Sequence, residues 1–277
     1  MTKTLAGGAE RISDAFEVAR QEGRAALMPY MMGGFPDLET AVAVADAYVE
    51  SGADLVELGV PFSDPLADGP VIHDAGTRAL AAGATLEGVL EICGRLAERV
   101  PVVPMVYANM ALARGVGEFS ALLAEAGAAG AIIPDLPLGE EDALGNALRG
   151  AGLAPVPLVA PTTPADRRRR ICQGASGFVY VVSDTRVTGE RDELPAGLED
   201  LVHAVRADAN VPVAVGFGIG TPEQAATVGA IADGVIVGSR LVRAVAEAGG
   251  AAEAAGAAGG FIREAREAMA RSGGPVE

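Results

Sequence analysis

The chain has 277 residues, half of which are hydrophobic, and a formal net charge of −16 at pH 7. This length allows one large domain or two small ones, and the apolar content is ample for a sizeable core. The acidic balance argues against nucleic acid and anionic membranes as partners, because both would repel such a surface. An anionic substrate would have to be held by local dipoles.

The rare residue types restrict the possible chemistry. Lys3 is the only lysine, and His73 and His203 are the only histidines. A Schiff-base lysine, a P-loop lysine and a three-histidine metal site are therefore excluded or nearly so. Cys93 and Cys172 have no cysteine or histidine neighbour at metal-ligand spacing, so we expect two buried thiols and no metal site. Carboxylates, hydroxyls and backbone amides must carry most of the chemistry.

The chain contains no targeting or membrane signal that we can identify. No apolar run approaches the roughly 20 residues of a membrane span. The first five residues also lack the apolar core of a signal peptide. We expect a cytoplasmic protein.

Short apolar runs alternate with longer amphipathic, alanine-rich runs. Helical spacing predicts a first helix over 10–22, ended by Gly23. The rest of the pattern predicts, in chain order, strand 26–32 and helix 37–51; strand 55–60 and helices 74–82 and 86–99; strand 102–107 and helix 116–126; strand 130–134 and helix 140–151; strand 155–160 and helix 164–173; strand 177–183 and helix 197–208; strand 211–216 and helix 222–229; strand 234–237 and helix 239–247.

Eight strand-helix units in this length indicate an α/β fold, a single (β/α)8 TIM barrel. The strands read as continuous apolar runs, which is typical of a parallel sheet covered on both faces. A further helix over 251–272 is expected to pack outside the barrel, and no linker divides the chain. We expect one domain over 1–277, with 1–9 and 273–277 frayed. The main rival fold is a doubly wound open sheet.

The second predicted strand, 55–60 (LVELGV), carries Glu57 in an otherwise apolar run. Catalytic groups of such barrels lie at the C-terminal ends of the strands and in the loops that follow. A buried carboxylate has a raised pKa, which suits a general acid/base. The alternative is that Glu57 only faces a helix amide or solvent.

The loop that follows, 61–70 (PFSDPLADGP), carries two more carboxylates, Asp64 and Asp68. Each is followed by turn-forming residues. In this setting an aspartate is more often an Asx-turn or helix-cap residue than a catalyst. The residues alone therefore favour a turn role for both.

Two glycine motifs late in the chain indicate phosphate binding. Residues 216–220 (GFGIG) follow the seventh predicted strand, and Gly238-Ser239 follows the eighth and opens a helix. Barrels commonly bind phosphate with these two loops and a nearby helix N-terminus. Backbone amides and the Ser239 hydroxyl can bind the anion, so no cationic side chain is needed.

Three further features are open to two interpretations. The polar segment 183–191 (SDTRVTGER) could be a lid or a plain solvated loop. Tyr107 and Tyr180 end predicted strands and could reach the mouth of the barrel, although a buried tyrosine more often only satisfies its hydroxyl. His73 and His203 are interpreted as surface or cap residues.

Together these motifs resemble the alpha subunit of tryptophan synthase. The most specific match is 57–70 (ELGVPFSDPLADGP). Supporting matches occur in the same order and spacing across nearly the whole chain: PY at 29–30, PD at 36–37, YAN at 107–109, PDLP at 134–137, GFVY at 177–180, VTG at 187–189, GFGI at 216–219 and GS at 238–239.

The resemblance implies a carbon–carbon lyase of tryptophan biosynthesis, which cleaves indole-3-glycerol phosphate to indole and glyceraldehyde 3-phosphate by a retro-aldol reaction. It implies that Glu57 protonates indole C3 and takes the proton of the glycerol hydroxyl. It implies that Asp68 holds the indole N–H and that Tyr180 lines the site. Further implied residues are Gly189, Phe217, Gly218, Gly238 and Ser239 for the phosphate, and Thr188, Tyr107 and Tyr30 for the lid and pocket.

The resemblance also implies a partner, a beta subunit that carries pyridoxal phosphate and receives indole through a tunnel. The expected assembly is an alpha2-beta2 heterotetramer, with Asp64 and Pro65 in the contact. No cofactor is expected in this chain.

One departure concerns the lid, which usually reads SRxGVTG in the family. Here Asp184 replaces the arginine and Arg186 the glycine, whereas Thr188 and Gly189 are kept. If the glycine was needed for a positive φ, lid closure and coupling to the beta subunit would change.

Three alternative functions remain. The chain could be a stand-alone lyase that releases free indole, or a non-catalytic partner that regulates a beta subunit. Another phosphate-binding barrel, such as a sugar-phosphate isomerase, would share the two late loops but not the 57–70 stretch.

Overall fold

The protein is described by a computed structural model that covers residues 7–136, 141–182, 196–216 and 218–272. Its strands form one parallel sheet in the order β5-β4-β3-β2-β1-β9-β8-β7-β6. They are β1 (Ala26–Met32), β2 (Val56–Gly59), β3 (Val102–Met105), β4 (Gly130–Ile132), β5 (Ala154–Val156), β6 (Leu158–Val159), β7 (Val179–Val182), β8 (Val213–Gly216) and β9 (Gly234–Val237).

The barrel closes through one interrupted strand. β5 pairs with β4 and β6 pairs with β7, and only Pro157 separates β5 from β6. The strand predicted over 155–160 therefore divides at this residue, and its two pieces pair with different neighbours. β5 and β6 therefore occupy one position, and the predicted eight-stranded TIM barrel is confirmed, against the open sheet.

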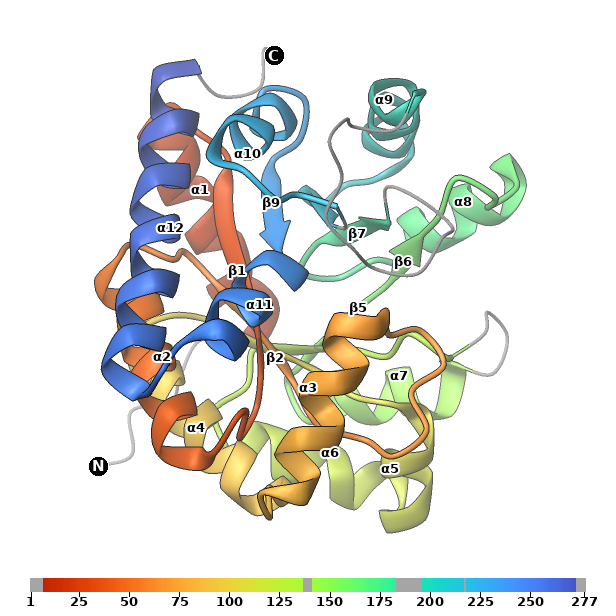
Figure 1. Cartoon of the computed structure of the whole chain (residues 1–277). Helices are drawn as coiled ribbons and strands as arrows, with labels where there is room; N and C mark the ends of the chain where they lie inside the picture. Colours follow the sequence, from red (N-terminus) through yellow and green to blue (C-terminus); the bar gives the residue numbers. More distant parts are fainter. Residues whose placement is uncertain (1–6, 137–140, 183–195, 217, 273–277) are drawn as a thin grey trace, which may run out of the picture.

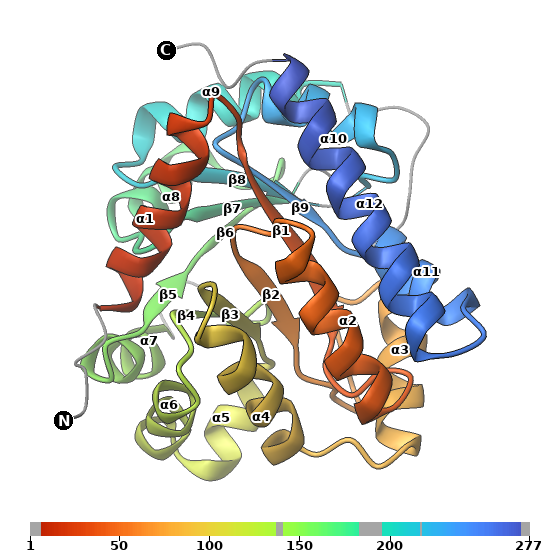
Figure 2. The same ribbon diagram turned by 90° about the vertical axis from the view of Figure 1, so that its left-hand side faces the viewer.

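The helices surround the strands, and α12 lies alongside α2 and α10 (Figures 1 and 2). They are α1 (Gly8–Gln21), α2 (Leu38–Glu50), α3 (Pro70–Ala81), α4 (Leu86–Ala97), α5 (Ala108–Arg114), α6 (Val116–Glu125), α7 (Glu141–Gly150), α8 (Ala165–Gln173), α9 (Leu198–Asp208), α10 (Pro222–Gly229), α11 (Ser239–Glu247) and α12 (Ala251–Ser272). The predicted C-terminal helix outside the barrel is α12.

Three helix predictions need correction. α1 starts at Gly8, inside the segment expected to fray, because the Gly8 N–H donates to the carbonyl of Gly152 at 2.9 Å. α3 starts at Pro70, four residues before the predicted start, with proline in the first turn where its missing N–H costs nothing. The short helix α5 was not predicted, and Gly115, with φ of 89°, ends it.

The N-terminal end of the barrel is closed by α1. Ile12 and Phe16 of this helix belong to the apolar cluster inside the barrel. The Phe16 ring lies 5.8 Å from that of Phe178 just before β7, and a Cβ on Gly234 would lie 2.8 Å from the Phe16 ring. Of the two ends of the barrel, the C-terminal end is therefore the one left open for a site.

A buried ionic network joins α12 to this closed end. The Arg24 guanidinium, with its side chain 2 % exposed, donates to both oxygens of Asp54 at 2.6 and 2.8 Å. Asp54 also accepts the Leu27 N–H at 2.7 Å, which fixes the start of β1. Arg266 of α12 reaches Glu22 at 2.6 Å and Asp54 at 3.4 Å.

We predict that Asp54→Ala lowers the free energy of unfolding by about 3 kcal/mol, because Arg24 would stay buried without its main counter-ion. Urea denaturation measures this change. The control is Asp46→Ala, which breaks an ion pair to Arg95 that is 54 % exposed and should cost about 1 kcal/mol or less. Equal effects of the two substitutions would contradict the prediction.

Candidate active site

Glu57 lies inside the barrel on β2. Side chains alternate along a strand, and Leu55 belongs to the inner cluster whereas Val56 and Leu58 belong to the outer one, so Glu57 faces inward. The residue is 2 % exposed. Burial, with a smaller contribution from the charge of Asp68, raises the pKa of Glu57 to about 8. Near neutral pH this carboxyl therefore holds a proton that it can donate.

Asp68 lies at the end of the loop after β2. Its charge is close enough to Glu57 to raise the pKa of that carboxyl. Its Oδ1 accepts a hydrogen bond from the Tyr107 hydroxyl at 2.8 Å. Burial raises the pKa of Asp68, although the Tyr107 hydrogen bond and the charge of His73 act in the opposite direction. The N-cap of α3 is Gly69 and not Asp68, so the helix-cap interpretation of Asp68 is wrong.

Tyr107 holds the 61–69 loop against β3. It lies at the N-cap position of α5, and its hydroxyl donates to Asp68 and accepts the Ala67 N–H at 3.1 Å. The Phe62 ring stacks on the Tyr107 ring at 5.3 Å. The tyrosine thus satisfies its hydroxyl by fixing the loop, and it does so at the mouth of the barrel.

Two further phenols reach the inner wall because glycines leave room for them. A Cβ on Gly59 would lie 2.1 Å from the Tyr30 hydroxyl, and a Cβ on Gly216 would lie 2.3 Å from the Tyr180 hydroxyl. Tyr30 is also the register partner of Glu57 across β1 and β2. Burial raises the pKa of both phenols well above the ordinary value, with the charge of Glu57 acting in the same direction.

The glycine loops lie at the same end of the barrel. Gly218, with φ of 87°, follows β8, and Gly238 is the N-cap of α11, whose first residue is Ser239. A Cβ on Gly238 would lie 3.7 Å from the Tyr30 Cβ, so this helix N-terminus adjoins the tyrosine that faces Glu57. Free N–H groups at a helix N-terminus suit an anion.

The remaining predicted residues divide into three groups. Thr188, Gly189, Phe217 and the lid positions Asp184 and Arg186 lie outside the described residues. Asp64 is exposed and Pro65 half-buried at the tip of the 61–69 loop, far more open than Glu57. His73 and His203 are exposed, as predicted, and both cysteines are buried and free.

Two contributors to the site were not predicted from the sequence. Phe62 fixes Tyr107 by stacking, and Gly59 admits the Tyr30 phenol. The available signals were an aromatic residue in a polar loop of a chain with 4 % aromatic residues, and a glycine at the end of an apolar strand. Neither signal identifies its partner, which lies more than 25 residues away in both cases.

The described residues contain neither a metal-binding cluster nor a membrane-spanning helix. No cluster of three or more histidine, cysteine, aspartate or glutamate side chains there could hold a metal ion. None of the helices in that part of the chain combines the length and apolar character needed to cross a membrane.

The fold and the site define a class: a TIM barrel with a proton-bearing carboxyl inside, a second carboxylate at its mouth, and phosphate-type glycine loops beside them. A family model described as "Tryptophan synthase alpha chain" matches residues 16–269. The chain belongs to the tryptophan synthase alpha chain family.

Individual relatives agree with this assignment. The tryptophan synthase alpha chain of Prochlorococcus marinus (strain MIT 9313) is 47% identical over 264 residues, which cover 93% of this chain and 94% of that one. That of Synechococcus sp. (strain CC9902) is 48% identical, covering 91% and 95%. A Mycobacterium tuberculosis tryptophan synthase structure superposes with a TM-score of 0.87 at 36% identity, covering 96% and 99%. The Legionella pneumophila str. Paris alpha subunit gives 0.85 at 38% identity, covering 94% and 98%.

The raised pKa of Glu57 predicts a pH-dependent stability. The folded state binds the Glu57 proton more tightly than the unfolded state, so this residue lowers the free energy of unfolding as pH rises from about 4.5 to about 8. Glu57→Gln cannot titrate. The variant should therefore gain stability relative to the parent across this window, by an amount on the order of a few kcal/mol.

Urea denaturation of both proteins at pH 5 and pH 8 measures this gain, because the other titrating groups cancel in the difference. A stability difference that is the same at both pH values would contradict the raised pKa.

Proposed function

We propose that this chain catalyses the retro-aldol cleavage of indole-3-glycerol phosphate to indole and glyceraldehyde 3-phosphate. The observation that carries the proposal is the buried Glu57 carboxyl, with its pKa near 8, beside Asp68 at the barrel end that also holds the glycine loops. A cleavage that uses neither a Schiff-base lysine nor a metal must activate the leaving carbon by protonating it. Membership of the tryptophan synthase alpha chain family supports the same reaction.

In the proposed mechanism Glu57 transfers its proton to indole C3. The positive charge that results spreads to the indole nitrogen, whose N–H is held by the Asp68 carboxylate. The Glu57 carboxylate then removes the proton from the hydroxyl on the carbon bonded to C3. The carbon–carbon bond breaks, its electron pair returns to the indole ring, and the hydroxyl carbon leaves as the aldehyde. Glu57 ends in its protonated form, ready for another cycle.

The phosphate is assigned to the two late loops. In this proposal Gly218, Gly238 and Ser239 donate backbone or hydroxyl groups to it, and Gly189 and Phe217 complete the set. The N-terminus of α11 contributes its dipole, so the phosphate needs no lysine. Tyr30, Tyr107 and Tyr180 are assigned to the pocket walls, and Tyr180 is counted with Glu57 and Asp68 among the catalytic residues. Thr188 is assigned to the lid, where it meets Asp68.

We propose further that the chain acts in the cytoplasm with a beta subunit that carries pyridoxal phosphate, as an alpha2-beta2 heterotetramer. Structures of tryptophan synthase from M. tuberculosis are similar to it at 34% to 36% identity. Asp64 and Pro65 are assigned to the contact. The neighbouring Leu66 is 82 % exposed, and burying its apolar side chain in the contact would be favourable.

We expect Glu57→Gln to lower turnover by about 100- to 10,000-fold, the usual contribution of a general acid/base group. Indole release from indole-3-glycerol phosphate measures it. The variant should still bind glycerol 3-phosphate as the parent does, because the glycine loops are unchanged. Turnover close to the parent value would refute the role of Glu57.

The partner proposal predicts that adding a beta subunit stimulates indole release. Leu66→Asp should weaken this stimulation and leave the unaided activity unchanged. The control is Val18→Asp, which changes a residue of α1 that is 51 % exposed at the closed end of the barrel. Full activity without a beta subunit would favour the stand-alone lyase, and absence of indole release with intact partner binding would favour the regulatory role.

A further inference from the structure

A cavity of about 620 Å³ lies between α7, α8 and the strands β4 to β6. These two helices flank β5 and β6 on the same side of the molecule (Figure 1). The cavity is lined by residues of both helices and by residues at β4, β5 and β6, and its volume is in the range of roughly 300 to 1,000 Å³ of small-molecule sites.

The floor of the cavity is apolar. Ile133, at the end of β4, is 9% exposed, and Leu148 of α7 is 1% exposed. Ile171 of α8 is half-buried and lines the opposite wall. A ligand bound here would place an apolar group against these side chains.

The rim of the cavity is cationic. Arg149 of α7 and Arg167 and Arg170 of α8 line it, and among the described residues of its lining Asp135 is the only acidic one, which gives three positive charges against one there. This balance is opposite to that of the whole chain, whose net charge is −16. The Asp135 Oδ1 already accepts the Ala108 N–H at 2.8 Å.

Among the residues that the structure describes, neither Arg149 nor Arg170 makes a close ion pair. Arg170 reaches Asp166 only at 3.7 Å, between side chains that are 65% and 75% exposed, and Arg149 bonds the neutral Asn146 at 3.1 Å. Arg168 of the same helix, by contrast, donates to Asp208 at 2.8 Å and does not line the cavity. The guanidinium groups on the rim are therefore available to an anion.

We propose that this cavity binds an organic anion that joins a carboxylate to an aromatic body. The planar guanidinium groups recognise a carboxylate by paired hydrogen bonds, and the floor of Ile133, Leu148 and Ile171 takes the ring. Neither Glu57 nor Asp68 lines this cavity, so it is distinct from the site proposed for the cleavage.

Isothermal titration calorimetry with 2-naphthoate tests the proposal on the full chain, with saturating glycerol 3-phosphate present to occupy the inner site. We expect saturable binding, and binding that is at least tenfold weaker for the neutral 2-naphthylmethanol. Arg167→Ala combined with Arg170→Ala should weaken 2-naphthoate binding about tenfold or more. Ile171→Trp, which fills the cavity and keeps its charges, should also weaken it.

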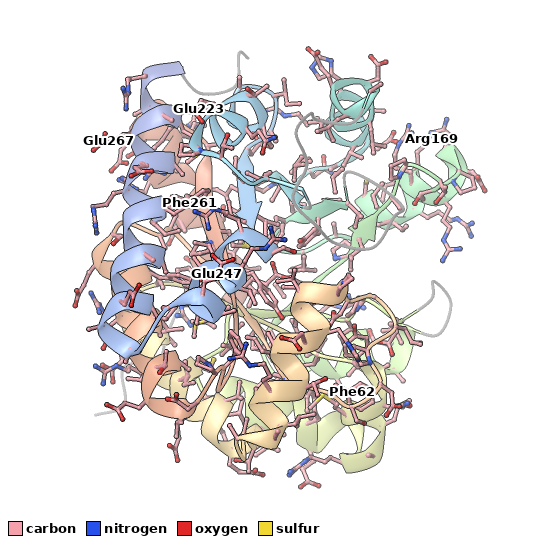
Figure 3. The ribbon with its side chains drawn as sticks, in the orientation of Figure 1. Phe62, Arg169, Glu223, Glu247, Phe261 and Glu267 are labelled. Carbon is pink, nitrogen blue, oxygen red and sulfur yellow. The ribbon has the colours of Figure 1, made fainter. Side chains whose placement is uncertain are left out.

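The matched control removes two charges elsewhere. Arg169 extends outward from α8 (Figure 3) and does not line the cavity, and Arg271 of α12 is 75% exposed. Arg169→Ala combined with Arg271→Ala should leave the affinity within about twofold. No binding by the parent chain, equal binding of the neutral analogue, or equal losses in the test and control variants would each overturn the proposal.

Discussion

The burial of one carboxyl group is the constraint on which the rest of the site depends. A charged carboxylate is costly inside a barrel, so Glu57 keeps its proton until the pH approaches 8. This requires that water be kept from the closed end, which α1 achieves with Ile12 and Phe16. The negative charge of Asp68 also raises the pKa of Glu57. The closed end of the barrel thus contributes to the chemistry at the open end.

The shape of the site is set by glycines as much as by its functional side chains. Tyr30 and Tyr180 reach the inner wall because Gly59 and Gly216, each on the neighbouring strand, carry no Cβ. The same arrangement therefore occurs in both halves of the barrel, at β1 with β2 and at β7 with β8. Larger residues at either glycine would displace a phenol from the wall. The space for a ligand is defined by these two pairs.

The fold was largely predictable because its signals are local. Continuous apolar strands indicated a parallel sheet, and caps such as Asp37 and Thr221 bond the helices that follow them. The role of Asp68 was not predictable from residue type, since its partner Tyr107 lies 39 residues away. The pairing of the two pieces beside Pro157 with different strands, and the hydrogen bond from the Ala108 N–H of α5 to Asp135, both involve residues far away in the sequence and were not predicted. Residue type suggested a buried acid at Glu57, but only the three-dimensional structure supplies its burial.

The net charge of −16 has a narrower meaning than the composition first suggests. Salt screens the repulsion between the net charge of the protein and a distant anion beyond about 8 to 10 Å at physiological ionic strength. It therefore disfavours extended polyanions such as nucleic acid. A small anion in a pocket responds instead to the groups within a few ångströms. In the two proposed sites these are the backbone N–H groups near Gly238 and the guanidinium groups of α7 and α8. An acidic chain can bind small anions wherever its local fields are positive.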